Sequence, residues 1–398
     1  MDERVPGPIW RVTGDLLTGE PLASGAVDGP LAGVRVAVKD LFAIAGQQIG
    51  AGNPDWLAEA PVQERNAWAV QALLDAGAQV TGLAQTDELA FSLNGTNRHY
   101  GTPPNGAAPG RITGGSSNGP ASAVSLNLVD LGLGTDTAGS VRVPASHCGL
   151  YGLRPTHGAV RSDGLLALAA SFDTIGWFAR DPELLERAGD VLLPPGDADL
   201  PLSFVIAEDV LALAEPATRA SFETACEALT PMRRIESLMG GRLEEWFAAF
   251  RSVQGDEAWQ QHGAWIEAHP GSLGPGVMAR FALGRDLKPQ DLDTGKRILD
   301  EARETLHSAI QPGTVLLLPA ATAPAPHVDL DPAAMDAYRF QTLRLTCLAS
   351  IAGLPAVVMP HLRVDGLPVG LCAIGARGTD RSLLRLASRT GKPAPGQT

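Results

Sequence analysis

The residues best suited to chemistry lie in two segments rich in glycine and serine. Residues 114–120 read GGSSNGP, and residues 134–144 read GTDTAGSVRVP. A serine hydroxyl attacks a carbonyl carbon only when a neighbouring base takes its proton. Ser116 and Ser140 are therefore candidate nucleophiles, and each would need a base within hydrogen-bond reach. The chemistry that such a residue could do is attack on a carbonyl carbon.

Other interpretations of these segments compete with this one. Residues 115–119 match the G-x-S-x-G pattern of a nucleophile elbow, but the preceding PGRIT at 109–113 does not read as a clear strand. Residues 134–140 have the glycine spacing and final serine of a P-loop but lack its lysine. An isolated Gly-Gly-Ser-Ser run is most often a tight structural connection.

Three motifs taken together favour an active site over a structural connection. AVKD at 37–40, GGSS at 114–117 and GTDTAGSVR at 134–142, in that order, resemble the amidase signature family. The resemblance extends to TDE at 86–88, CGLYGLRP at 148–155, GLPAVVMP at 353–360 and GLPVGL at 366–371. Within that family, NPDW at 53–56, NGTNRHYGTP at 94–103 and SFDTIGWFAR at 171–180 are most similar to plant-type indole-3-acetamide hydrolases.

The resemblance implies a catalytic triad of two serines and a lysine. Ser140 would be the nucleophile that forms an acyl-enzyme, Ser116 the proton relay and Lys39 the base. Lysine accepts a proton at pH 7 only if burial disfavours its charged form. Strand alternation would send Asp40 to the opposite face, away from Lys39. The implied reaction is hydrolysis of a carboxylic amide, with arylacetamides such as indole-3-acetamide as preferred substrates.

The glycines and small residues around the serines also have implied roles. The family carries its relay serine after a cis peptide, which Gly115 would ease, and Ser117 supports the same turn. The backbone N–H groups implied to face the oxyanion belong to Thr137, Ala138, Gly139 and Ser140. Asp136 and Arg142 are expected to form a structural pair. The family usually has glycine where Ala138 stands, at a position expected to need unusual dihedral angles.

No metal or cofactor is expected. Neither His-x-x-x-His nor His-Glu-x-x-His occurs, and the four cysteines lack the spacing of zinc or redox motifs. The formal net charge of -13 disfavours nucleic acid as a partner. No apolar stretch approaches a membrane span, and the charged residues 1–4 lead into no signal peptide, so a cytoplasmic protein acting on a small-molecule amide is predicted.

The elements that must position these residues follow from hydrophobic periodicity. Strands are predicted at 34–38, 78–83, 129–133, 202–206, 315–318, 356–359 and 369–374. Helices are predicted at 67–76, 182–192, 216–229, 242–261, 290–310 and 332–351. Their alternation predicts an α/β fold with a mixed, largely parallel central sheet and helices on both faces.

The chain is predicted to form one domain over residues 1–398, with a helical layer or lobe at about 200–311. A homodimer is a family-level expectation. Three alternatives stay open at this point: an amidase for another aliphatic, aryl or urea-like amide, the amidase subunit of a tRNA-dependent amidotransferase complex, and a docking protein. The intact Lys39, Ser116 and Ser140 argue against the docking role.

Overall fold

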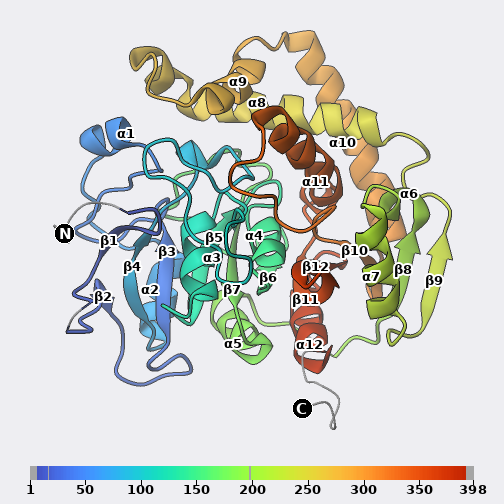
Figure 1. Ribbon diagram of the computed structural model, residues 1–398, viewed down its shortest axis with the longest axis horizontal. Coiled ribbons are helices and arrows are strands. Elements are labelled where there is room, and N and C mark those ends of the chain that lie inside the picture. Colours follow the sequence, from blue (N-terminus) through green and yellow to red (C-terminus); the bar gives the residue numbers. More distant parts are fainter. Residues whose placement is uncertain (1–6, 17, 197–198, 391–398) are drawn as a thin grey trace.

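A central sheet runs through the molecule, and Figure 1 shows it with helices on either side. The computed structural model describes residues 7–16, 18–196 and 199–390, so residues 1–4, on which the absence of a signal peptide was argued, lie outside it. Its strands are β1 (Trp10–Thr13), β2 (Ala23–Ser24), β3 (Arg35–Lys39), β4 (Gln79–Ala84), β5 (Leu131–Asp136), β6 (Tyr151–Arg154), β7 (Thr174–Ala179), β8 (Ser203–Ala207), β9 (Met232–Ile235), β10 (Thr314–Pro319), β11 (Ala356–Val364) and β12 (Leu367–Ile374).

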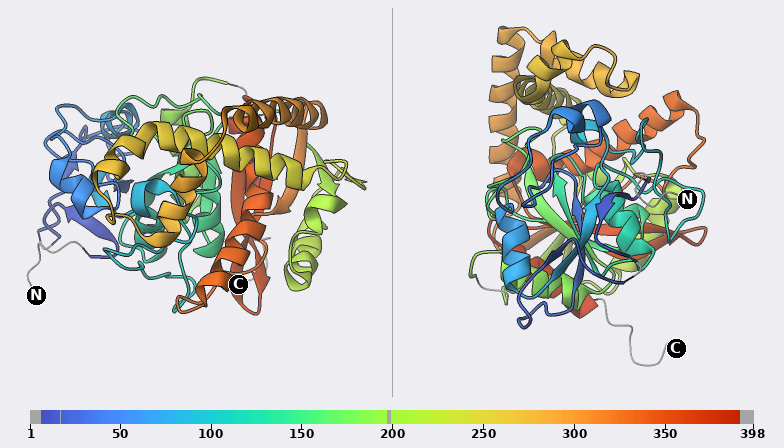
Figure 2. Two further views of the ribbon diagram at one scale, coloured as in Figure 1. Left: turned by 90° about the horizontal axis from the view of Figure 1, so that it is seen from above. Right: turned by 90° about the vertical axis from the view of Figure 1, so that its left-hand side faces the viewer.

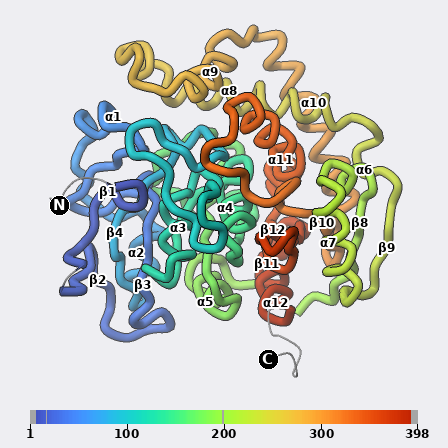
Figure 3. The backbone as a smooth tube through the Cα atoms, viewed as in Figure 1, coloured from blue at the N-terminus to red at the C-terminus, as the bar shows by residue number. Residues whose placement is uncertain are grey.

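The strand order is β1-β4-β3-β5-β7-β6-β11-β12-β10-β8-β9, with β2 paired to β4. The tube in Figure 3 places β1 and β9 at opposite ends of the molecule. The mixed sheet is confirmed, but the expectation that it is largely parallel was wrong. Among the described strands, only β3 with β4 and β5, and β8 with β9 and β10, pair in parallel. The middle of the sheet, from β5 through β12, is antiparallel. The expectation failed there because two of these strands, β6 and β7, were not predicted.

Helices cover both faces of the sheet. They are α1 (Pro54–Glu59), α2 (Trp68–Asp75), α3 (Asn118–Ser125), α4 (Arg142–His147), α5 (Pro182–Leu192), α6 (Glu208–Leu211), α7 (Pro216–Cys226), α8 (Leu243–Ala268), α9 (Pro275–Arg285), α10 (Pro289–Ala309), α11 (Pro332–Ala352) and α12 (Asp380–Thr390). One core packs α2, α5, α7 and α12 on one face, and a second core packs α3, α4, α8, α10 and α11 on the other. The six helices predicted from periodicity are all present.

Strand β3 illustrates how alternation assigns residues to these cores. Val36 and Val38 belong to the core under α2, α5 and α12, whereas Ala37 belongs to the core under α3 and α4. Side chains two residues apart in a strand share a face. Lys39 therefore follows Ala37 toward α3, which is the face that carries the serine-rich segments.

The helical layer is narrower than the predicted range of about 200–311. Helices α8, α9 and α10 pack together, and the right-hand view of Figure 2 shows them standing above the sheet, beyond the ends of its strands. Residues 203–235 instead contribute β8 and β9 to the sheet. Strand β8 pairs with β10 on one side and with β9 on the other.

Candidate active site

Lys39 lies at the end of β3 and is completely buried. Its Nζ donates to Ser116 Oγ at 2.8 Å and to Thr135 Oγ1 at 2.7 Å. Burial lowers the pKa of Lys39 to about 7, although the carboxylates of Asp87 and Asp173 act to raise it. A lysine with this pKa is partly neutral at neutral pH and can accept a proton.

Asp40 does not share the site with Lys39. It forms an ion pair with Arg11, whose Nε lies 2.8 Å from Asp40 Oδ2, and it accepts a hydrogen bond from the Gly50 N–H at 3.1 Å. Strand alternation therefore separates Asp40 from Lys39 as predicted, and the only side chains that Lys39 contacts by hydrogen bond in the described part of the chain are hydroxyls.

Ser116 is held by its backbone just before α3. The Gly115–Ser116 peptide bond is cis. The Ser116 carbonyl accepts from Thr86 Oγ1 at 2.9 Å and from the Asp87 N–H at 3.3 Å. A Cβ on Gly115 would lie 2.2 Å from Asp87 Oδ2, so no larger residue fits beside this carboxylate.

Ser117 ties the start of α3 to β5 instead of pointing at Lys39. Its Oγ donates to the Thr135 carbonyl at 3.2 Å and accepts from the Thr135 N–H at 3.3 Å. This close approach depends on Gly134, where a Cβ would lie 2.7 Å from Ser117 Oγ. Ser117 thus fixes Thr135, the second hydroxyl that contacts Lys39.

Ser140 follows the loop that leaves β5 and is 3% exposed. It lines a small pocket together with Thr137 and Ala138. Within the described residues, its hydroxyl forms no hydrogen bond, so Ser140 is not joined to Ser116 in this structure. The contact between Lys39 and Ser116 is therefore the one link of the expected triad that is formed directly.

The loop before Ser140 is organised by Asp136. This buried carboxylate pairs with Arg142 at 2.8 Å and with Arg154 at 3.0 Å. It also accepts from the N–H groups of Gly139 at 2.8 Å and Val141 at 3.1 Å. Burial alone would raise the pKa of Asp136, but the two guanidinium groups hold it well below its usual range. Asp136 and Arg142 thus form the pair expected from the sequence.

Two details of the loop differ from expectation. The Gly139 N–H was expected to face the oxyanion, but it donates to Asp136, so Thr137, Ala138 and Ser140 carry the N–H groups that have no partner among the described residues. Ala138 was expected to need unusual dihedral angles, but the left-handed φ, +132°, belongs to Gly139. The Ala138 carbonyl accepts from Thr346 Oγ1 at 2.5 Å, so α11 supports the loop.

The opposite wall of the pocket was missed by sequence reasoning. It consists of Phe91 with Leu168, Gln254 from α8, Arg280 from α9, and Arg339 and Leu343 from α11. These residues come from helices far apart in the sequence and carry no shared motif. The only available signal was the placement of polar residues on otherwise apolar helix faces.

The histidines do not form a conventional triad with Ser140. His147 is buried, which lowers its pKa to about 3, and its Nε2 lies 2.7 Å from the Tyr338 hydroxyl. His99 Nε2 lies 3.0 Å from Glu88 Oε1 and 3.1 Å from the Ser272 carbonyl, next to the connection between α8 and α9. Over residues 7–16, 18–196 and 199–390, no group of three or more His, Cys, Asp or Glu could hold a metal ion.

No helix within the described part of the chain is long and apolar enough to cross a membrane. The four cysteines are buried free thiols, and burial raises the pKa of Cys148 to about 12, so its thiol stays protonated near neutral pH.

Comparisons with known proteins agree with this geometry. The family model described as Amidase matches residues 19–217. Amidase 1 from Arabidopsis thaliana is 34% identical, and the match covers 93% of this chain and 95% of that protein. Translocon at the outer membrane of chloroplasts 64 from Pisum sativum is 33% identical over 89% of this chain and 65% of its own length. A solved structure described as a crystal structure of amidase superposes with a TM-score of 0.81 at 30% identity, covering 90% of this chain and 84% of that one. The chain therefore belongs to the amidase family and is an amidase.

Proposed function

We propose that this amidase cleaves carboxylic amides through an acyl-enzyme on Ser140, with Ser116 as the proton relay and Lys39 as the base. The observation that carries the proposal is the fully buried Lys39, whose Nζ lies 2.8 Å from Ser116 Oγ. A hydroxyl both accepts and donates a proton. Ser116 can therefore receive the proton of Ser140 while passing its own to neutral Lys39.

In the first step the Ser140 oxygen forms a bond to the amide carbon, and the proton of Ser140 moves through Ser116 to Lys39. The same path returns a proton to the departing nitrogen, which leaves as ammonia or an amine. Water then attacks the acyl-enzyme by the same relay and releases the acid. The N–H groups of Thr137, Ala138 and Ser140 are proposed to stabilise the oxyanion, since preorganised donors contribute most when the negative charge develops.

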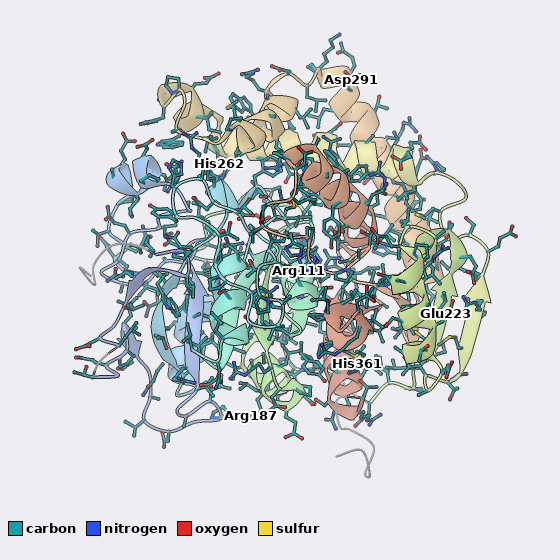
Figure 4. All side chains as sticks on the ribbon, in the orientation of Figure 1. Arg111, Arg187, Glu223, His262, Asp291 and His361 are labelled. Atoms are coloured by element: carbon teal, nitrogen blue, oxygen red, sulfur yellow. The ribbon has the colours of Figure 1, made fainter. Side chains whose placement is uncertain are left out.

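The preferred substrates in this proposal are arylacetamides such as indole-3-acetamide. Phe91 supports an aromatic acyl group because it lines the pocket and packs edge-on against Phe281, with ring centroids 4.9 Å apart. Phe281 in turn contacts His262, which Figure 4 labels on α8. Other aliphatic, aryl or urea-like amides remain the alternative within the same chemistry.

The second candidate function is that of the amidase subunit of an amidotransferase complex. For either function we propose that the protein is located in the cytoplasm. One experiment separates the two. The purified chain is treated with a fluorophosphonate, the labelled residue is mapped, and ammonia release is measured over a panel of amides without any partner. We expect a label on Ser140 and turnover by the chain alone. Absence of both would refute the hydrolase, and turnover that requires an added partner subunit would favour the complex.

A further inference from the structure

The pocket beside Ser140 contains an excess of positive charge. Arg280 from α9 and Arg339 from α11 both line it. Among the described acidic residues, Asp336 is the one that contacts both. It accepts from Arg339 Nε at 3.0 Å and lies 3.8 Å from Arg280 Nη2. The charges of Asp87 and Glu88 also act on Arg280, but neither carboxylate forms an ion pair with it. In a chain with a formal net charge of -13, two guanidinium groups around one half-exposed carboxylate mark a local reversal of charge.

Several donors in this pocket have no partner. Arg280 Nη1 donates to the Phe91 carbonyl at 3.0 Å, but its Nε is buried without a hydrogen bond. Arg339 donates from Nε to Asp336. Its terminal nitrogens form no hydrogen bond within the described residues and, unlike Arg280 Nε, are not fully buried. A buried donor left without a partner carries a desolvation cost, so a site of this kind favours a ligand that supplies acceptors.

Gln254 adds a third unpartnered group. Its side chain is 5% exposed, lines the same pocket from α8, and forms no hydrogen bond in the part of the chain that the structure describes. Behind Arg339 the positive charge continues. The guanidinium groups of Arg339 and Arg251 lie 4.1 Å and 4.7 Å from the ring centroid of Phe340. Burial and the nearby charges of Arg339 and Arg344 lower the pKa of Arg251.

We propose that the acyl part of the amide carries a carboxylate, which Arg280 and Arg339 bind while Gln254 donates from its amide. This inference rests on the proposed function and, among the arylacetamides and other amides considered there, favours those that carry a carboxylate over neutral ones such as indole-3-acetamide. Guanidinium forks match the two oxygens of a carboxylate, and a desolvated pocket strengthens the pairing. Hydrolysis then converts an amido acid and water into a dicarboxylic acid and ammonia, with Ser140 attacking the amide end.

The test compares matched amides that differ only in a carboxylate. The pairs are butanamide with succinamate, and phenylacetamide with 4-(carbamoylmethyl)benzoate. We expect kcat/KM of the chain to be at least about tenfold higher for the carboxylated member of one pair or both. We also expect succinate to inhibit competitively and butanoate to inhibit much more weakly.

Variants then assign the effect to the pocket. Arg339→Met and Arg280→Met are expected to lower the ratio of kcat/KM, carboxylated over neutral, by about 10- to 100-fold. Gln254→Leu is expected to lower it less. Arg344→Met is the matched control, because Arg344 lies on the same helix but pairs with the exposed Glu244 outside this pocket. If a methionine variant does not fold, Arg280→Lys and Arg339→Lys, which keep the charge but lose the guanidinium fork, and succinate inhibition of the unmodified chain decide the question.

A neutral amide preferred over its carboxylated partner, with no inhibition by succinate, would overturn the proposal. Equal losses on both members of a pair in the arginine variants would do the same. Failure of the proposed function has a different signature, since then no amide is turned over and the fluorophosphonate leaves Ser140 unlabelled. If Ser140 is labelled and only neutral amides are turned over, the proposed function stands and the proposal of a carboxylated substrate is rejected.

Discussion

Two regions meet at Ser140, and they are built differently. The catalytic side, as proposed above, consists of Lys39, Ser116 and Ser140, placed by neighbouring strands β3 and β5 and by the starts of α3 and α4. The helical wall consists of Gln254, Arg280 and Arg339, placed by α8, α9 and α11. The catalytic side is held by short contacts between motifs, whereas the helical wall depends on how three helices pack. Changes on the first side should affect every substrate, and changes on the second should affect the choice among substrates.

Replacing Lys39 with alanine gives the largest expected loss. Since a positioned base contributes roughly 10²- to 10⁴-fold, kcat/KM should fall by about 10³-fold for every amide. In the unmodified chain, kcat/KM should rise with pH through about 7, because the proposed base is the neutral form of Lys39. Lys39→Ala should lose this acid limb. Lys296→Ala, at an exposed lysine on α10, is the control. A loss of kcat/KM confined to one class of amide would contradict the prediction that changes on the catalytic side affect every substrate.

Removing the charge of Asp136 should lower the free energy of unfolding more than it lowers the rate of catalysis. Asp136→Asn leaves Arg142 and Arg154 buried without their carboxylate, so the free energy of unfolding should fall by about 3–5 kcal/mol in urea at pH 7. Asp130→Asn breaks an exposed pair with Arg35 and should cost less than about 1 kcal/mol.

The pH dependence of this loss has a definite sign. The pKa of Asp136 is depressed in the folded chain, whereas an unfolded aspartate titrates near about 3.9. Its contribution is therefore complete above that unfolded pKa and is lost as pH falls toward the folded pKa. The gap between the unmodified chain and Asp136→Asn should shrink in that acid range. A gap that widens on acidification would contradict the assignment.

Sequence reasoning reached the catalytic side because its residues sit in contiguous motifs beside regular strands. The strand that ends at Lys39 and the helices beginning at Pro182, Pro216 and Pro332 were predicted, since proline suits the first helical turn. Strands β6 and β7 were missed. They are short and fully buried, and each is interrupted by a glycine, Gly152 or Gly176, so they lack the alternation that identifies a strand.

The helical wall could not be predicted for a different reason. Arg280 and Arg339 face the same pocket only because α9 and α11 pack beside it, and no local pattern specifies that contact. Gly139 shows the same limit on a smaller scale. Its N–H could be placed in the oxyanion loop, but whether it meets Asp136 or the substrate depends on a turn closed by tertiary contacts.

Thr346 tests whether the two regions are coupled, since it reaches from α11 to the loop before Ser140. Thr346→Val removes the hydrogen bond to the Ala138 carbonyl, so kcat should fall by about 2- to 10-fold equally for all amides. Thr346→Ser should restore it. Thr305→Val is the control, because Thr305 makes a comparable bond to a helix carbonyl, that of Glu301, on exposed α10. A change in substrate preference instead of kcat would place Thr346 with the helical wall.

Asp87 offers a finer adjustment of the catalytic side. Its carboxylate is the strongest of the charges that raise the pKa of Lys39, ahead of Asp173 and Asp136, while Arg280 faces Asp87 itself. Asp87→Asn should therefore move the acid limb of kcat/KM to lower pH, since Lys39 then loses its proton more easily. Asp380→Asn, at a buried carboxylate bound to Thr156, should leave the limb in place. A shift to higher pH in Asp87→Asn would exclude this charge effect.

Replacing Ala138 with the glycine usual in the family should have the smallest effect. Ala138 does not adopt a left-handed φ, because Gly139 carries that conformation, so glycine relieves no strain at position 138. The unfolded chain gains conformational freedom, which should lower the free energy of unfolding by about 0.4–1 kcal/mol. We expect kcat on neutral amides to change less than about threefold, whereas Ala90→Gly, at the pocket alanine that does adopt a left-handed φ of +60°, is the contrasting variant in which glycine relieves strain. A tenfold rise in kcat would mean that the Cβ of Ala138 does narrow the oxyanion loop, and that the catalytic side is less fully determined by its shared motifs than the contact between Lys39 and Ser116 indicates.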